Sequence, residues 1–352
     1  MSRFLKEAFK SLSCYVPGEQ FQDRKFIKLN TNESPYPPSP LVAARAMEAA
    51  KCLQLYSDPE SAALRQAIAG LHQVKAENVI VSNGSDEVLN FAFLAFGDAS
   101  HPFVFADITY GFYKVLCDVN DIPYVTVPLR EDFTIRAEDY PDSGHIVLAD
   151  PNAPTGIPMP AEEVEKIVQA NPDRVVIVDE AYADFSESDC LSLALKYDNV
   201  LIVRTFSKSR SMAGARLGYA IGNEKLIVDL KLVKDSIDPY NVNLMTSAAG
   251  IAAIEENSYY MENCEKIIRT RRKTVKKLES MGFSVLPSGA NFVFARHPGI
   301  GGEQLYRKLK DKGVLIRHFS SERIRDFNRI TIGGEEQMDC FFNILDDCLN
   351  EL

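Results

Sequence analysis

Lys208 ends the stretch Thr-Phe-Ser-Lys, a loop of hydroxyl-bearing and small residues, and Arg216 follows eight residues later. The apolar run at residues 199–203 predicts a strand that leads into this loop. A lysine that forms an imine with an aldehyde cofactor must be partly desolvated, because the neutral amine is the nucleophile. The hydroxyls and the guanidinium can bind a phosphate group at the same place. An ordinary strand-to-helix loop with a surface lysine would have the same residues. Other segments must therefore decide between such a loop and a cofactor site.

The loop Gly84-Ser85-Asp86 follows a strand predicted at residues 78–81. Gly84 permits a tight turn, and the first amides of the helix predicted at residues 85–96 can bind a phosphate. A helix that is capped by Ser85 and has acidic residues in its first turn would explain the same residues without a phosphate. The loop therefore indicates a phosphate site only in combination with others.

Asp179 follows four apolar residues, 175–178, which places a carboxylate at the end of a buried strand. Burying a carboxylate is costly unless it meets a cation, and a protonated pyridine nitrogen is such a cation. Tyr182, three residues later, can hydrogen-bond to the phenolic oxygen of the same ring. A metal-binding acidic pair of Asp179 and Glu180, or a helix N-cap, remains an alternative.

Two more segments complete a possible cofactor site. Asn152 lies near the centre of a turn, residues 150–156, that two prolines and a glycine make rigid. Tyr110, after a strand predicted at residues 102–106, is placed to stack on a flat ring, although packing or a plain turn would explain these residues separately. Pyridoxal phosphate needs a lysine, a carboxylate at the ring nitrogen, a partner for the ring oxygen, a stacking ring and a phosphate site. The combined loops predict a pyridoxal phosphate site.

Short β-branched runs alternate with helical patterns as far as about residue 243. This alternation predicts an α/β domain with a mostly parallel sheet covered by helices, in which ligands bind beyond the carboxyl ends of the strands. A long charged helix and shorter strands then predict a smaller α+β domain. We expect an N-terminal arm at 1–28, a large domain at 29–243 and a small domain at 244–352. The predicted strands are 78–81, 102–106, 124–127, 145–148, 174–178, 199–203, 291–295, 314–317 and 328–332.

Composition excludes several classes of protein. The chain has 352 residues, a net charge of −10, 46% hydrophobic and 25% charged residues, which is typical of a soluble enzyme and argues against binding nucleic acid or an anionic membrane. No segment has the apolar length of a signal peptide or a membrane span. Seven cysteines without a CxxC pair indicate reduced thiols and a cytoplasmic protein. Five widely spaced histidines give no metal-binding pattern, so no metal is expected.

Six segments preserve the order and approximate spacing of motifs in a known family. They are Leu29-Asn30-Thr31-Asn32-Glu33-Ser34-Pro35-Tyr36, Gly84-Ser85-Asp86-Glu87, Thr109-Tyr110-Gly111-Phe112-Tyr113, Asp179-Glu180-Ala181-Tyr182, Thr205-Phe206-Ser207-Lys208 and Arg329-Ile330-Thr331-Ile332-Gly333. From about Tyr15 to the C-terminus the chain resembles the histidinol-phosphate aminotransferases. These are class II aminotransferases and pyridoxal-phosphate enzymes of fold type I. The resemblance is highly specific for the fold and the cofactor, and less so for the substrate.

The resemblance implies a role for each matching residue. Lys208 would hold the cofactor as a Schiff base and move the substrate proton, Asp179 would pair with the ring nitrogen, and Tyr182 would bond the ring oxygen. Tyr110 would stack on the ring. The arm would pack with the small domain and with the second subunit of a homodimer. The phosphate would be held by Gly84, Ser85, Asp86, Thr205, Ser207 and Arg216 with Tyr56 contributed across the dimer interface, and the substrate by Tyr15, Arg317 and Arg329.

The turn at residues 150–156 departs from the family. Members of the family usually carry an asparagine directly before the proline of the Pro-Thr-Gly turn, where it bonds the ring oxygen. Here that position is Ala153, and the nearby amide is Asn152. Either Asn152 takes over through a shifted backbone, or Tyr182 bonds the ring oxygen alone.

The resemblance implies ping-pong amino transfer from histidinol phosphate to 2-oxoglutarate, in histidine biosynthesis. A forked guanidinium suits both the phosphate of one substrate and the carboxylate of the other. An aminotransferase for aromatic or other amino acids remains an alternative, as does a threonine-phosphate decarboxylase on the same scaffold. Consumption of 2-oxoglutarate or release of carbon dioxide separates these readings. A cofactor-binding regulator would need a DNA-binding segment, for which we find no room in the chain.

Overall fold

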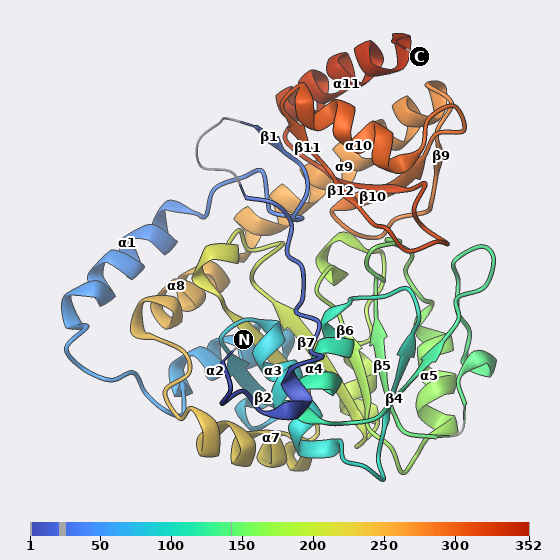
Figure 1. The fold of residues 1–352 in the computed structure, drawn as a ribbon. Helices are drawn as coiled ribbons and strands as arrows, with labels where there is room; N and C mark the ends of the chain where they lie inside the picture. The colour runs from blue at the N-terminus through green and yellow to red at the C-terminus, as the bar shows by residue number, and fades with distance from the viewer. Residues whose placement is uncertain (1, 21–25, 142, 352) are drawn as a thin grey trace.

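A seven-stranded sheet forms the centre of the larger part of the molecule (Figure 1). The computed structural model describes residues 2–20, 26–141 and 143–351. The strands are β2 (Val79–Ser82), β3 (Phe103–Ala106), β4 (Tyr124–Val127), β5 (His145–Ala149), β6 (Val176–Asp179), β7 (Val200–Thr205) and β8 (Gly218–Gly222). Their order in the sheet is β2-β8-β7-β6-β5-β3-β4. β8 is antiparallel to both of its neighbours and the other neighbouring pairs are parallel, so the predicted α/β class is confirmed.

Helices cover both faces of this sheet because its inner strands are apolar on both sides. In β7, Val200 and Ile202 belong to one buried cluster, while Leu201 and Val203 belong to another. The first cluster includes side chains of α1, α2, α5, α6 and α8, and the second those of α3, α4 and α7. Such uniformly apolar strands are typical of parallel sheets. The helices are α1 (Pro40–Ala49), α2 (Ala62–His72), α3 (Ser85–Phe96), α4 (Phe112–Asn120), α5 (Ala161–Ala170), α6 (Leu191–Lys196), α7 (Glu224–Ile237) and α8 (Leu244–Glu255).

The C-terminal part, drawn in orange and red in Figure 1, has its own core and sheets, to which residues 27–28, drawn in blue, contribute one strand. A four-stranded antiparallel sheet has the order β12-β13-β10-β9, and a separate parallel pair joins β1 to β11. The strands are β1 (Ile27–Lys28), β9 (Ser284–Val285), β10 (Phe292–Arg296), β11 (Val314–Leu315), β12 (Arg317–His318) and β13 (Asn328–Thr331). The helices are α9 (Asn257–Ser280), α10 (Gly302–Asp311) and α11 (Glu335–Asn350).

Short 3₁₀ helices complete the described elements. They are η1 (Glu7–Phe9), η2 (Ala50–Cys52), η3 (Ala76–Asn78), η4 (Ala137–Asp139), η5 (Ala183–Phe185) and η6 (Ala213–Ala215). No helix in the described ranges combines the length and the apolar character needed to cross a bilayer.

The division into an arm, a large domain and a small domain stays a prediction. Residues 1 and 21–25 of the predicted arm at 1–28 lie outside the described residues. α8 begins just after the boundary predicted at residue 243, yet it packs against α1 and α2, and its Ala249, Ala252 and Ala253 belong to a buried cluster of the large sheet. We therefore propose that the small domain begins within α9 rather than at α8. Limited proteolysis that released a folded fragment beginning at residue 244 would contradict this placement.

One predicted strand proved to be two. The apolar run at residues 314–317 gives β11, which pairs with β1, and β12, which pairs with β13. Ile316 is buried between them and belongs to neither strand. The chain thus changes sheets at this residue, which brings Arg317 opposite Arg329.

Candidate active site

The carboxyl ends of three neighbouring strands form the floor of a cavity. Ala149 pairs with Asp179, and Asp179 pairs with Val203, so β5, β6 and β7 end side by side. The loops that follow them enclose a cavity of about 220 Å³. Twelve residues predicted for the site line it, from both parts of the molecule: Tyr15, Ser85, Asp86, Tyr110, Asp179, Tyr182, Thr205, Ser207, Lys208, Arg216, Arg317 and Arg329.

Lys208 presents its amine to this cavity. Nζ donates a hydrogen bond to the carbonyl oxygen of Thr31 at 3.2 Å and lies 5.9 Å from the centre of the Tyr182 ring. Burial and the nearby positive charge of Arg329 lower the pKa of Lys208 to about 8. The neutral, nucleophilic form of the amine is therefore accessible near neutral pH.

Asp179 is only 6% exposed at the end of β6. Its carboxylate accepts hydrogen bonds from the Tyr113 hydroxyl at 2.7 Å and from the backbone N–H of Ala181 at 3.3 Å. Burial nevertheless raises the pKa of this carboxyl to about 6. A cation bound beside it would favour the ionised form. Tyr113 was not predicted as a site residue, although it lies in the same motif as Tyr110.

Glu180 faces away from Asp179, into a separate ion pair. Arg204 donates to its carboxylate from Nε at 2.9 Å and from Nη2 at 2.7 Å, and Nη2 also donates to Asp189 at 2.7 Å. The Glu180 side chain is fully buried. The acidic pair is thus divided between two environments, and the described residues contain no cluster of three or more potential metal ligands.

The Gly84 loop and Arg216 form a cradle at one end of the cavity. Gly84 has φ +84°, a backbone conformation that residues with a side chain rarely adopt, and a Cβ there would lie 2.5 Å from Nη2 of Arg216. Arg216 Nη2 donates to the Asp86 carboxylate at 3.1 Å, and Nη1 donates to Ser207 Oγ at 3.5 Å. Thr205 Oγ1 donates to Ser207 Oγ at 3.0 Å. Hydroxyls, a guanidinium and the first turn of α3 meet here, as a phosphate group requires.

Aromatic rings line the side of the cavity nearest α4. The Tyr110 hydroxyl donates to Asp86 at 2.9 Å, which anchors the outer end of the side chain. Tyr15 packs edge-on against Tyr110, with ring centres 5.7 Å apart and an angle of 69°. Burial raises the pKa of both phenols, so both are neutral at physiological pH.

Arg317 and Arg329 face each other across β12 and β13. Arg317 donates to the carbonyl oxygens of Val16 and Pro17 at 2.7 and 3.1 Å, and Arg329 donates to that of Asn30 at 3.1 Å. Burial lowers the pKa of Arg329, and its buried Nε has no hydrogen-bond partner in the described chain. Like charges placed opposite each other in a sheet are destabilising. The arrangement therefore favours an anion in the cavity.

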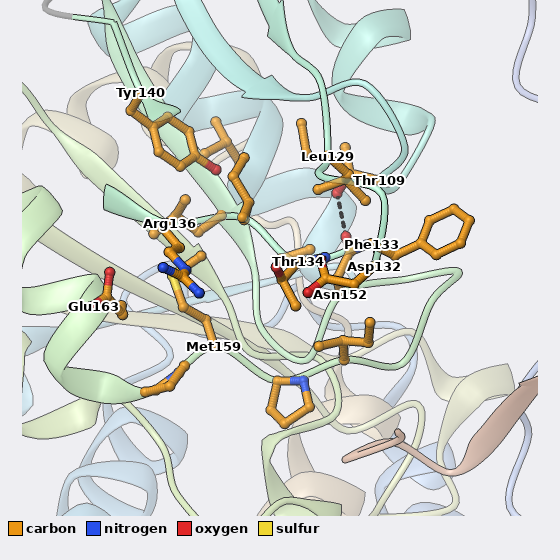
Figure 2. A pocket seen from close by; sticks show the side chains of 18 residues that line it. Thr109, Leu129, Asp132, Phe133, Thr134, Arg136, Tyr140, Asn152, Met159 and Glu163 are labelled. Atoms are coloured by element: carbon orange, nitrogen blue, oxygen red, sulfur yellow. Dashed lines mark hydrogen bonds between the residues drawn. The ribbon is translucent and has the colours of Figure 1, made fainter. Parts of the chain in front are cut away.

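Asn152 does not line the cavity of Lys208. It lines a neighbouring cavity of about 370 Å³, and Figure 2 shows it bonded to Thr109 there. Its Oδ1 accepts from Thr109 Oγ1 at 2.8 Å, and its Nδ2 donates to Thr155 Oγ1 at 2.9 Å and to the Ile108 carbonyl oxygen at 3.0 Å. The amide is thus used to join two loops behind the site. Of the two alternatives for the ring oxygen, these bonds favour Tyr182 without Asn152.

Tyr56 lies outside the cavity in the single subunit. It is 82% exposed and stacks on Tyr240, with ring centres 4.6 Å apart and an angle of 24°. The predicted contribution of Tyr56 to a second subunit's site stays a prediction.

The residues present fit pyridoxal phosphate. The Gly84 cradle suits its phosphate, and Asp179 offers a buried carboxylate with no basic residue hydrogen-bonded to it among the described residues. Lys208 is the lysine that lines the cavity, and the Tyr182 hydroxyl also faces it. Each of these groups matches a different part of the cofactor.

Comparison with known proteins places this site in a class. A family model described as aminotransferase class I and II matches residues 24–344. The crystal structure of histidinol-phosphate aminotransferase from Sinorhizobium meliloti in complex with pyridoxal-5'-phosphate is similar with a TM-score of 0.89 and 25% sequence identity, covering 100% of this chain and 99% of that chain. Fold and site together define a pyridoxal-phosphate-dependent aminotransferase of fold type I.

Curated relatives define the family more narrowly. A histidinol-phosphate aminotransferase of Brachyspira hyodysenteriae is 48% identical over 345 residues, which is 97% of each chain. One from a Marinomonas species is 48% identical over 343 residues, 96% of this chain and 97% of its own. The chain belongs to the histidinol-phosphate aminotransferase family. The predicted family, enzyme class and cofactor are thereby confirmed.

Proposed function

We propose that the protein transfers an amino group from histidinol phosphate to 2-oxoglutarate, giving imidazole acetol phosphate and glutamate. The observation that carries the proposal is the pairing of Arg317 with Arg329 beside Lys208 in one cavity. One substrate presents a phosphate and the other a carboxylate to the same guanidinium groups. The names of the 48% identical relatives support this choice of substrate.

We assign the cofactor contacts from the same geometry. Asp179 would face the ring nitrogen, Tyr182 the ring oxygen, and Tyr110 the face of the ring. Bound pyridoxal phosphate supplies an electron-poor ring that stabilises negative charge on the substrate carbon. The phosphate would be held by Gly84, Ser85, Asp86, Thr205, Ser207 and Arg216, which line or shape the cradle.

Lys208 would move the proton at the substrate carbon. With a pKa near 8, its amine can both accept and return a proton around neutral pH. Tyr15 and the arm would exclude water from this step, since Tyr15 packs on Tyr110 and the arm's carbonyl groups bind Arg317. Arg329 would fix the substrate anion, so that the reacting carbon lies near Lys208.

A half-reaction panel tests the substrate assignment. The holoenzyme is mixed separately with histidinol phosphate, glutamate, phenylalanine and threonine phosphate, and the cofactor spectrum is followed by stopped flow. We expect rapid spectral change with the first two and slow change with the others, because only the first two are the proposed amino donors. Fast reaction with phenylalanine, or carbon dioxide release from threonine phosphate, would support one of the alternative activities instead.

Arg329→Ala provides the control for the panel. Loss of one charge-assisted, forked contact should weaken both half-reactions by about 30- to 150-fold, which corresponds to about 2–3 kcal/mol. Equal rates for the variant and the wild type in both half-reactions would exclude Arg329 from the anion site.

We further propose a homodimer in which the partner subunit's Tyr56 reaches the phosphate cradle. Three other exposed apolar side chains, Met47, Leu53 and Leu55, precede Tyr56 in the chain. Exposed apolar side chains that gather in a patch commonly mark a protein interface. Mixing Lys208→Ala subunits with Tyr56→Ala subunits should restore activity that neither parent shows, because one site of each hybrid dimer is then intact. No gain on mixing, with hybrids verified by native mass spectrometry, would contradict the shared site.

The cytoplasm is the compartment we propose. All seven cysteines are unpaired, and four of them are buried: Cys117, Cys190, Cys264 and Cys348. Free thiols persist in a reducing compartment. Cell fractionation that recovered the protein outside the cytoplasmic fraction would contradict this assignment.

A further inference from the structure

The hydroxyl of Tyr182 has one hydrogen-bond partner among the described residues. Nδ2 of Asn32 donates to it at 2.9 Å. Both side chains line the cavity of Lys208, and Phe292 packs edge-on against the tyrosine ring with centres 5.2 Å apart. Because the amide is the donor, the phenolic oxygen accepts, and its own proton remains available for another partner.

The orientation of the Asn32 amide is fixed by a second pair of hydrogen bonds. The backbone N–H of Asn32 donates to Thr331 Oγ1 at 3.0 Å, so the threonine proton must go elsewhere. Thr331 Oγ1 lies 3.0 Å from Asn32 Oδ1 and donates to it. Oδ1 thus accepts from Thr331, and Nδ2 donates to Tyr182.

The backbone of Asn32 is held as firmly as its side chain. Its carbonyl oxygen accepts from Asn291 Nδ2 at 2.9 Å, and the residue is 1% exposed. Its φ of +56° lies in the left-handed region, which asparagine tolerates better than most residues. Thr331 and Asn291 belong to the C-terminal part of the chain, whereas Tyr182 follows β6. Asn32 thus joins the two parts of the molecule at the cofactor site.

No other side-chain amide is in position to replace this contact within the described chain. Asn152 lines the neighbouring cavity and is bonded to Thr109 there (Figure 2). It also donates a hydrogen bond to Thr155. Ala153 lines the cavity of Lys208 but has no polar side chain. We therefore assign the ring oxygen of the cofactor to the Tyr182 hydroxyl.

We propose that Asn32 is a positioning residue that directs the proton of Tyr182 toward the ring oxygen of bound pyridoxal phosphate. The inference rests on the proposed role of Tyr182. By occupying an acceptor site on the phenolic oxygen, Asn32 leaves the cofactor as the acceptor for the hydroxyl proton. A donor to the ring oxygen stabilises its negative charge and so favours loss of the proton that the cofactor shares with Lys208.

Two substitutions of Asn32 distinguish this role from simple packing. Asn32→Ala removes the donor, and we expect kcat/KM to fall about tenfold, as for loss of one hydrogen bond. Asn32→Asp preserves the shape but places an acceptor beside the hydroxyl, which turns the proton away from the cofactor. Aspartate should therefore be more damaging than alanine at pH 8, where a carboxylate is ordinarily ionised. A packing role predicts the opposite order, because aspartate has the size of asparagine.

The readout is the pH titration of the bound cofactor's absorption band in each holoenzyme, together with kcat/KM and the thermal midpoint. Both Asn32 variants should shift the titration to higher pH, and Tyr182→Phe should shift it at least as far. In the Tyr182→Phe background neither Asn32 substitution should shift it further, since the hydroxyl through which Asn32 acts is gone. A full effect in that background, or a greater effect of alanine than of aspartate, would overturn the inference and leave the proposed function intact. An unchanged titration in Tyr182→Phe alone would overturn the role of Tyr182 itself.

Discussion

Lys208→Ala is expected to abolish amino transfer, with kcat reduced by about 10⁴-fold, the upper range for loss of a positioned acid–base group. Lys208 is the lysine that lines the cavity, and its pKa of about 8 makes roughly half of its amine neutral at pH 8. An exposed lysine is neutral to only about 1% or less at that pH. Steady-state assay with histidinol phosphate and 2-oxoglutarate measures the loss, and the absorption band of the reloaded cofactor should be displaced.

Lys208→Arg is the matched variant, because it retains a cation at nearly the same place. A guanidinium is never neutral in the working pH range and cannot act as a nucleophile. We expect the arginine variant to be as inactive as the alanine variant. Recovery of activity with arginine would indicate a purely electrostatic role. Borohydride reduction that fixed the cofactor to a different lysine of the wild type would contradict the assignment altogether.

The sheet could be predicted in large part because apolar periodicity is a local property. The predicted strand at residues 124–127 matches β4, and the predicted helix at 85–96 matches α3. The division of residues 314–317 between β11 and β12 could not be predicted in this way. It depends on which distant strands, β1 and β13, are available to pair. Pairing of this kind is not encoded in the run itself.

Site residues could be predicted from the sequence where they lie at the carboxyl ends of predicted strands. Asp179 ends β6 and Lys208 follows β7, and parallel strands bring such residues to one edge of the sheet. Asn32 and Tyr113 were missed as site residues because their partners, Tyr182 and Asp179, are distant in the chain. Hydrophobic periodicity predicts which face of a helix or strand a residue occupies. It does not predict which side chain of another element that residue will contact.

Asn152 shows that the correct residue type near the expected position does not ensure a place in the site. Its amide lies in the predicted turn, one residue from Ala153, but the backbone directs it to Thr109 instead of Lys208. Tyr56 illustrates a different limit, because its proposed site belongs to a second subunit. Neither outcome follows from residue type and spacing alone.

Asp179 combines near-complete burial with a carboxyl pKa raised to about 6, an unfavourable combination for the protein by itself. Its hydrogen bonds from Tyr113 and Ala181 only partly offset the cost of burial. A protonated ring nitrogen would provide the missing charge. Asp179→Asn keeps the shape of the side chain and an oxygen for Tyr113, and it removes only the charge.

We expect Asp179→Asn to lower kcat by about 10²–10³-fold, the usual cost of removing one preorganised electrostatic contact. In this variant, the part of the pH dependence of cofactor affinity that arises from the Asp179 carboxyl should also disappear. In the wild type, protonation neutralises Asp179 as the pH falls through about 6, so affinity should weaken on the acid side by up to about tenfold per pH unit. The free cofactor titrates identically in both experiments, so a difference between the two affinity profiles at pH 5–8 reports the charge of Asp179 and its effect on the ring nitrogen. Parallel profiles would show that Asp179 does not face the charged ring nitrogen.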